Sequence, residues 1–462
     1  MKEAVSNIGM KLTFYGGTGT VTGANFLLEA TDSLKILIDC GMLQGSNLSD
    51  AFNRDPFPYN PADINFLIVT HAHMDHIGRI PKLVRDGFKG RILSTAPTME
   101  LAVVLLDDAL SIQEMKARKT GVSAPFDKQD IEKAFSLWET VEYHQTFALG
   151  EGVSIYLRDA GHILGASMIE IDNGKVKTVF TGDLGNSPSL LLNDTEDIKD
   201  VDYIIMESVY GDRNHEPKEV RRNMLRETIK NIISKKQLLI IPAFSLERTQ
   251  GMLYEMNTFF EDHELSHVPV FLDSPMAIKV TEIYVKYSSY LNESVRKEIK
   301  SGDDIFNFPK LKLTGSSRDS EKINFTHNPK IIIAGSGMSS GGRVVNHEKQ
   351  HVGDQNVVIL MVGYQAAGTL GRQLEDGAKS VVINGQNTPV RAKVLKIEGY
   401  SSHKDSDNLT AFVETANNSK KLKKVFAVMG EPKSALFLVQ RLRDELGVNA
   451  VNPSYGETVY LS

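Results

Sequence analysis

Cysteine and tryptophan are almost absent from this 462-residue chain, which has one of each. The single cysteine, Cys40, excludes an internal disulfide framework and any cysteine-rich zinc module. No apolar run approaches the roughly 20 residues that a membrane span needs. The N-terminal segment also lacks the basic start and apolar run of a signal peptide. We therefore expect a cytoplasmic protein that does not enter a membrane.

An excess of positive charge is also missing, because the formal net charge is −6. This argues against a broad surface that coats nucleic acid, although a local cationic groove stays compatible with it. The hydrophobic content of 41% and the charged content of 24% are typical of soluble globular proteins. The length exceeds that of one ordinary core, so we expect two or more domains.

Short strands that end in polar loops dominate residues 1–209. Two amphipathic helices, expected over 97–119 and 127–141, interrupt them. Residues 210–385 differ, because continuous apolar runs alternate with helices, which is the pattern of a parallel sheet buried on both faces. Residues 386–462 again show short strands that end in polar loops, as residues 1–209 do. The sequence thus predicts one layered α/β domain, split by an inserted α/β domain.

The segment THAHMDHIGRIP, residues 70–81, follows an apolar strand and places four potential metal ligands within six positions. These are His71, His73, Asp75 and His76. Metal ligands need lone pairs that converge about 2.0–2.2 Å from the ion, and a loop at a strand end offers that freedom. Four groups so close in sequence do not wrap one ion comfortably, so the pattern favours two ions with further ligands from elsewhere.

Two residues at other strand ends are candidates for those further ligands: His162 in DAGHILGAS and Asp183 in FTGDLGN. Each alone is an ordinary turn residue, because polar residues beside glycine are common in turns. Together with the cluster at 71–76 they predict a metal centre built from several strand ends.

The order of these segments resembles the metallo-β-lactamase superfamily, and within it the β-CASP nucleic-acid-processing nucleases. The resemblance is strongest to the RNase group that includes the endonuclease of eukaryotic pre-mRNA 3′ processing and its prokaryotic relatives. It implies an αββα sandwich, formed by residues 1–209 and 386–462 and interrupted by a β-CASP domain over 210–385. The matching segments are GGTGTVTGANFLLE, ILIDCG, THAHMDHIGRIP, AGHILGAS, FTGDLG, MESVYGDR, PAFSLERTQ, DSPMA, AGSGMSSGGRV, GYQAAGTLGR and GYSSHKD.

The resemblance implies two zinc ions. The first would be held by His71, His73 and His162. Asp75 and His76 would hold the second, with Asp183 bridging both. Asp39 would steady the surrounding loops, although an aspartate that caps a turn is nearly as good an explanation.

Three residues would carry the chemistry. Asp75 would orient the attacking water, while Glu207 and His403 match the acid and the histidine of two β-CASP motifs and would protonate the leaving oxygen. Arg248, Ser336 and Arg343 lie in small polar loops after apolar strands and are our candidates for substrate binding. Each of these three is otherwise a residue of a glycine-rich turn or a solvated arginine.

The sequence departs from the family pattern at Met429, where the RNA-cleaving members carry a histidine that ligates the second zinc. A thioether is a weak, neutral donor that suits soft ions better than Zn²⁺, so an apolar plug is the better interpretation of Met429. The protein then binds its second zinc weakly, works with one zinc, or is catalytically impaired. Glu247 also departs, since a glycine is usual there.

The leading hypothesis is a zinc-dependent ribonuclease that cleaves single-stranded RNA as an endonuclease, with 5′ exonuclease action as an addition. Met429 keeps two alternatives open, because DNA-cleaving members tend to carry an apolar residue there: a nuclease for single-stranded DNA, and a nuclease-like scaffold. The inserted domain and the match at His403 argue against a small-molecule hydrolase. Family members often dimerise, so a homodimer is a further expectation.

Overall fold

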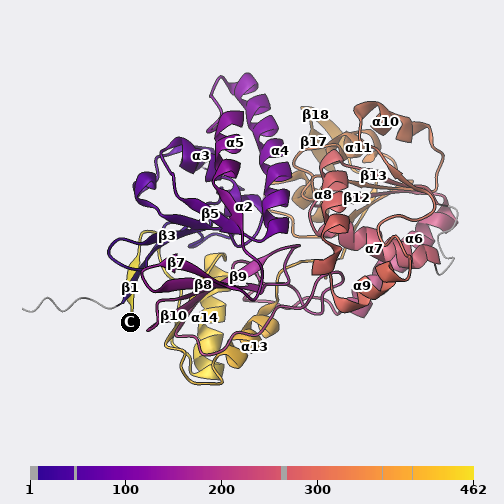
Figure 1. Cartoon of the computed structure of the whole chain (residues 1–462). Coiled ribbons are helices and arrows are strands. Elements are labelled where there is room, and N and C mark those ends of the chain that lie inside the picture. Colours follow the sequence, from indigo (N-terminus) through magenta and orange to yellow (C-terminus); the bar gives the residue numbers. More distant parts are fainter. Residues whose placement is uncertain (1–8, 46–48, 262–267, 367, 398) are drawn as a thin grey trace, which may run out of the picture. The chain divides into compact units, whose positions relative to one another are not determined.

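The computed structural model describes residues 9–45, 49–261, 268–366, 368–397 and 399–462. The chain folds as two compact units (Figure 1). The first unit contains the chain up to Ser189, Asp194–Asn214 and His403–Ser462, and the second contains Leu190–Asn193 and His215–Ser402. Among the described residues, no helix has the length and apolar character that crossing a bilayer requires.

Within its described residues, the first unit has two seven-stranded sheets. One has the order β22 (Thr458–Leu461), β1 (Met10–Phe14), β2 (Phe26–Glu29), β3 (Lys35–Ile38), β4 (Phe66–Ile68), β5 (Arg91–Ser94) and β6 (Trp138–Thr140). The other has the order β21 (Ala450–Val451), β20 (Lys424–Val428), β11 (Tyr203–Glu207), β10 (Lys177–Phe180), β9 (Ser167–Asp172), β8 (Val153–Asp159) and β7 (Thr146–Gly150).

The core of the first unit lies between these sheets. Phe14 and Phe26 come from one sheet, and Phe180 and Phe426 from the other, and their rings pack with centroids 5.4–6.2 Å apart. All four side chains are buried in one apolar cluster, which stabilises the face-to-face packing of the sheets.

Helices cover the outer faces of this sandwich (Figure 1). Thr95 caps the long helix α4 by accepting a hydrogen bond from the Thr98 amide, and Gly121, with φ of +73°, ends it. The αββα sandwich expected from the resemblance is therefore confirmed. The helices of this unit are α1 (Ser49–Arg54), α2 (Met74–Ile77), α3 (Ile80–Arg85), α4 (Ala96–Thr120), α5 (Lys128–Ser136), α13 (Ser406–Ala416) and α14 (Pro432–Leu446).

Over its described residues, the second unit is built on a six-stranded parallel sheet with the order β14 (Leu311–Leu313), β13 (Val270–Asp273), β15 (Lys330–Ala334), β12 (Leu238–Pro242), β16 (Val357–Met361) and β19 (Lys393–Lys396). A hairpin of β17 (Ser380–Ile383) and β18 (Gln386–Pro389) accompanies it. Its helices are α6 (Lys218–Lys235), α7 (Arg248–Glu261), α8 (Pro275–Lys286), α9 (Glu293–Lys300), α10 (Ser317–Lys322), α11 (Val344–His351) and α12 (Leu370–Glu375). The inserted α/β domain with a buried parallel sheet is thus confirmed.

Two elements differ from the sequence expectation. The helix expected over 127–141 ends at Ser136, and Trp138–Thr140 instead form β6 beside β5. The indole of Trp138 donates a hydrogen bond to the Ser94 hydroxyl at 2.9 Å, which a continued helix would not allow. The strand β19, expected with the C-terminal part of the first domain, pairs in parallel with β16 of the second unit.

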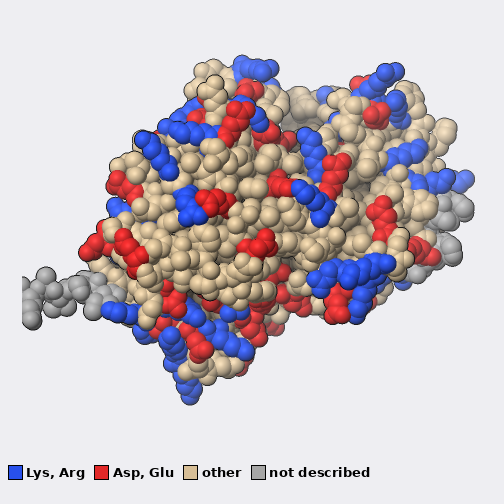
Figure 2. Space-filling view, viewed as in Figure 1, with Lys and Arg blue, Asp and Glu red and all other residues tan. Residues whose placement is uncertain are grey.

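Basic and acidic side chains are interspersed on the face shown in Figure 2. On this face, cations do not dominate, which agrees with the negative net charge.

Candidate metal centre

Three loops of the first unit bring the expected ligands of the first ion together. His71 and His73 follow β4, His162 follows β8, and Asp183 follows β10. The His73 Nδ1 atom lies 3.1 Å from His71 Nε2 and 3.2 Å from His162 Nε2. The Asp183 Oδ2 atom lies 3.4 Å from His71 Nε2 and 3.5 Å from His162 Nε2.

These four donor atoms fit a divalent metal ion. Neighbouring ligands of a tetrahedral ion with bonds of about 2.0–2.1 Å lie about 3.3 Å apart, close to the observed spacing. Burial lowers the pKa of all three histidines, so their rings are neutral at neutral pH and keep lone pairs for a metal. The four residues are thus spaced to hold one metal ion.

A second candidate metal position lies beside the other carboxylate oxygen of Asp183, Oδ1. The Asp183 Oδ1 atom is 3.4 Å from His76 Nε2, which is 3.9 Å from Asp75 Oδ2. Asp183 Oδ1 and His76 Nε2 are both buried, and neither has a hydrogen-bond partner among the described residues. Buried polar atoms without partners are costly unless something else satisfies them, and a cation between them would do so.

The electrostatics at this second position favour positive charge. Burial alone would lower the pKa of His76, but the carboxylates of Asp183 and Asp39 raise it well above its ordinary value. Burial would likewise raise the pKa of Asp183, yet His76, His71 and His403 hold it well below its usual range. The same field that attracts a proton to His76 attracts a divalent ion.

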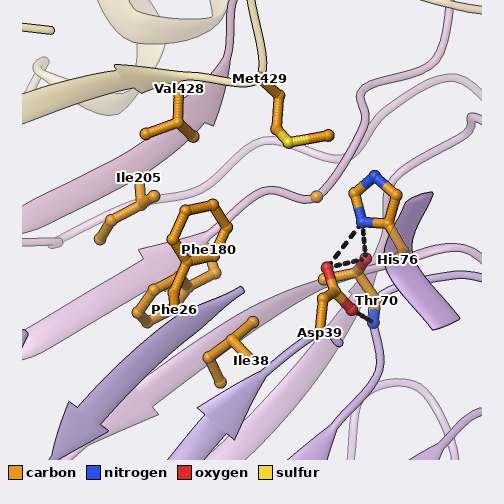
Figure 3. Close-up of a pocket in the computed structure, with 10 residues that line it drawn as sticks. Phe26, Ile38, Asp39, Thr70, His76, Phe180, Ile205, Val428 and Met429 are labelled. Atoms are coloured by element: carbon orange, nitrogen blue, oxygen red, sulfur yellow. Dashed lines mark hydrogen bonds and ion pairs between the residues drawn. The ribbon is translucent and has the colours of Figure 1, made fainter. Parts of the chain in front are cut away.

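Asp39 and Thr70 orient the ligands (Figure 3). The Asp39 carboxylate, 1% exposed, accepts hydrogen bonds from the Thr70 amide and hydroxyl, both at 2.8 Å, and from His76 Nδ1 at 2.7 Å. The Thr70 hydroxyl also lies 3.0 Å from His71 Nδ1. Contacts of this kind fix which ring nitrogen faces a metal. Sequence reasoning missed Thr70, although its place between the strand and His71 is a usable signal.

Glu207 and His403 meet beside the first ligand set. Glu207 ends β11, is fully buried, and accepts a hydrogen bond from the Leu184 amide at 2.6 Å. Both of its carboxylate oxygens lie 3.2 Å from His403 Nδ1. Burial raises the pKa of Glu207, whereas Glu207 and Asp183 outweigh burial at His403 and raise its pKa to about 9. His403 therefore carries a proton at neutral pH, held by a buried carboxylate.

Met429 lies at the end of β20, next to the second position. Its side chain is 2% exposed and extends into a pocket that His76, Asp39 and Thr70 line on the polar side (Figure 3). The opposite wall is apolar and consists of Phe26, Ile38, Phe180, Ile205 and Val428. Among the described residues that line the pocket, His76 is the one nitrogen ligand, and the Asp39 carboxylate is hydrogen-bonded to Thr70 and to His76 Nδ1.

Two of the three residues expected to bind substrate are engaged inside the second unit. The Arg248 guanidinium donates to the Val362 carbonyl. Arg343 Nη1 lies 2.6 Å from Asp273 Oδ1 and donates to the Thr314 carbonyl at 2.7 Å. Arg343 therefore anchors its own loop to the neighbouring strand ends.

The remaining candidate and the departure at position 247 lie in loops of the same unit. Ser336 Oγ accepts a hydrogen bond from the Ser340 amide at 3.0 Å, within the glycine-rich loop. Glu247 has φ of +61°, which explains why glycine suits this position. Its carboxylate accepts a hydrogen bond from the buried Tyr284 hydroxyl, which ties this acid to its own unit.

Comparisons with known proteins match three consecutive parts of the chain. Residues 27–207 match the model of the metallo-β-lactamase superfamily domain, and residues 249–374 match that of the Beta-Casp domain. Residues 387–453 match a family described as the Zn-dependent metallo-hydrolase RNA specificity domain.

Similar proteins match over nearly the whole chain. Ribonuclease TTHA0252 of Thermus thermophilus is 33% identical, over 88% of this chain and 91% of its own length. The RNase J-like protein of Methanocaldococcus jannaschii is 32% identical over 87% and 89%, and the transcription termination factor FttA of the same organism is 31% identical over 94% and 69%. A solved Enterococcus faecalis protein of unknown function shares the fold, with a TM-score of 0.58 at 12% identity, over 98% of this chain and 100% of its own.

Proposed function

The chain belongs to the β-CASP branch of the metallo-β-lactamase superfamily and is a metal-dependent hydrolase, and from this we propose that it hydrolyses phosphodiester bonds of single-stranded RNA. The observation that carries the proposal is the convergence of His71, His73, His162 and Asp183 beside the Glu207–His403 pair. Its similarity to ribonucleases and the match of residues 387–453 support RNA as the substrate. A cytoplasmic location and a homodimer stay predictions.

We further propose that the metal is zinc. Three neutral imidazoles and one carboxylate form a donor set typical of zinc, whereas calcium and magnesium prefer oxygen ligands. When bound, such ions supply Lewis acidity that activates water and neutralises charge on the phosphate. Because the pocket that Met429 shares with His76 offers no nitrogen donor besides His76 among its described residues, we propose that the second position holds its ion less tightly than the first.

The residues around the metal centre supply the remaining steps. Asp75 and Asp183 would accept hydrogen bonds from the attacking water and so orient it, and Asp75, whose pKa burial raises, would take the one proton that the water loses. As the new phosphorus–oxygen bond forms and the bond to the 3′ oxygen breaks, His403 gives its proton to the leaving oxygen. Glu207 positions His403 through Nδ1 and stabilises its charge before the transfer.

Cleavage of end-labelled single-stranded RNA, beside DNA of the same sequence, tests this proposal. For the Glu207→Gln variant we expect unchanged metal content and at least about a hundredfold loss of cleavage, because the proton donor is no longer held. Glu132→Gln, at an exposed position of α5, is the matched control and should cleave normally. Full activity of Glu207→Gln would remove the pair from the mechanism, and cleavage of DNA alone would overturn the substrate.

A further inference from the structure

The parallel sheet of the second unit has a topological switch point between β15 and β12. These strands are neighbours, but the chain runs from β12 to β13 in one direction and from β15 to β16 in the other. Right-handed crossovers then carry their loops to opposite faces of the sheet. In open α/β sheets, ligands bind outside the carboxyl ends of the strands at such a point. The chain leaves β16 towards β19, away from β12, so β12 and β16 form a second switch point. The loops after β12, β15 and β16 are therefore where a ligand of this unit is expected.

These three loops are fastened together by direct contacts. The Gln365 side-chain amide donates to the Gly337 carbonyl at 2.9 Å and to the Gly363 carbonyl at 3.1 Å, which joins the exits of β15 and β16. The Phe244 ring, at the exit of β12, lies so close to Gly337 that a Cβ atom there would come within 2.5 Å of it. The loops at the carboxyl end of the sheet thus form a preformed surface, as binding sites usually do.

Two aromatic residues belong to these loops. Phe244 is only half-buried, although every residue of β12, which it follows, is buried. Tyr364 follows β16 directly after Gly363 and is 39% exposed. Aromatic rings on a rigid surface are where proteins stack the bases of single-stranded nucleic acids. The metal centre does not use either ring, because its ligands all belong to the first unit.

We propose that Phe244 and Tyr364 form a nucleobase-stacking site for single-stranded RNA at the switch point of the second unit. This rests on the proposed function, because it takes RNA as the substrate, and it adds a contact to the bases themselves. Stacking tolerates every base, so the site contributes affinity without sequence preference. The competing explanation is that Phe244 only spaces the loop at Gly337.

Binding of labelled single-stranded RNA to the metal-loaded full chain tests the site. Phosphorothioate linkages keep the charge and bases of the strand while slowing hydrolysis, so fluorescence anisotropy reports affinity alone. We expect Phe244→Leu and Tyr364→Leu each to raise Kd about fivefold or more, because each removes one stacking surface. Phe325→Leu is the matched control in the same unit: Phe325 is 84% exposed, and its variant should bind normally.

A strand with abasic residues separates stacking from loop packing. The unchanged protein should bind the abasic strand more weakly than the intact one, and the two leucine variants should lose this difference. Equal binding of both strands by the unchanged protein would overturn the stacking site while leaving the proposed function intact, whereas failure to bind any RNA would overturn both. If Phe244→Leu lowers the melting temperature, its loss of binding could come from loop packing. The comparison of intact and abasic RNA then uses Tyr364→Leu.

Discussion

Each unit buries an aspartate at the carboxyl end of a strand, and the two are satisfied in different ways. Asp273, at the end of β13, accepts hydrogen bonds from Arg343, Thr314, Ser320 and His347 at 2.6–2.8 Å. Asp183, after β10, faces histidine nitrogens at 3.4–3.5 Å, and its Oδ1 atom has no hydrogen-bond partner among the described residues. A buried carboxylate whose oxygens all accept hydrogen bonds stabilises the fold. A buried carboxylate that has an oxygen without a hydrogen-bond donor and lies among histidines is arranged to bind a cation.

Replacing Asp183 with asparagine should have the largest effect. We expect bound metal to be lost and RNA cleavage to fall at least about 10³-fold, because Lewis-acid stabilisation is worth several kcal/mol. Metal analysis and single-turnover cleavage measure this. Asp273→Asn is the paired control, since it removes an equally buried carboxylate and should keep its metal. Loss of metal in both variants would erase the distinction between the two aspartates.

Asp273→Asn should instead destabilise the second unit by about 3 kcal/mol, because Arg343 and His347 lose the charge that they surround. Urea unfolding, followed with a probe in the second unit, measures the change in the free energy of unfolding. A change below about 0.5 kcal/mol would mean that this hydrogen-bonded cluster is not structural.

The pH dependence of the same variant provides a control. Burial alone would raise the pKa of Asp273. Hydrogen bonds outweigh burial and lower this pKa to about 2, and they come from His347, Ser320, Arg343 and Thr314. A folded-state pKa below the unfolded value stabilises the protein above the unfolded pKa and stops doing so as pH falls through the folded one. The advantage of the unchanged protein over Asp273→Asn should therefore shrink between about pH 4 and pH 2.

A smaller effect is expected at Met429. Met429→His adds a nitrogen donor at the second position and should tighten retention of the second ion about tenfold. Met429→Leu keeps the apolar volume and should behave like the unchanged protein. Isothermal titration with zinc measures both. A weaker second ion in Met429→Leu would mean that the thioether is itself a ligand, and the apolar interpretation would be wrong.

The sequence predicted which residues gather at the metal centre but not what orients them. The sequence shows the first ligands because four residues of ligand type lie close together after a strand: His71, His73, Asp75 and His76. His162 and Asp183 could be predicted because each follows another strand, and the structure brings both to His71 and His73. The orientation of His76 by Asp39 and Thr70 depends on how two strand ends meet. Local patterns do not contain that information.

Arg343 shows why the contacts of a single side chain are hard to predict, and its role in substrate binding stays a prediction. From the sequence it is an arginine after a glycine-rich loop, which suits a phosphate. In the fold, the Arg343 guanidinium pairs with the carboxylate of Asp273, which lies 70 residues earlier in the chain. The same holds for Trp138, whose bond to Ser94 ends a helix that local propensity would continue. Long-range partners decided both outcomes.

The number of divalent ions that the unchanged protein retains after dialysis tests the central claim most directly. We predict about one tightly held zinc per chain and a second that fills only at higher free zinc, with cleavage of RNA lost in a strong chelator and restored by zinc. A folded protein that retains no metal and still cleaves RNA in the chelator would contradict the account.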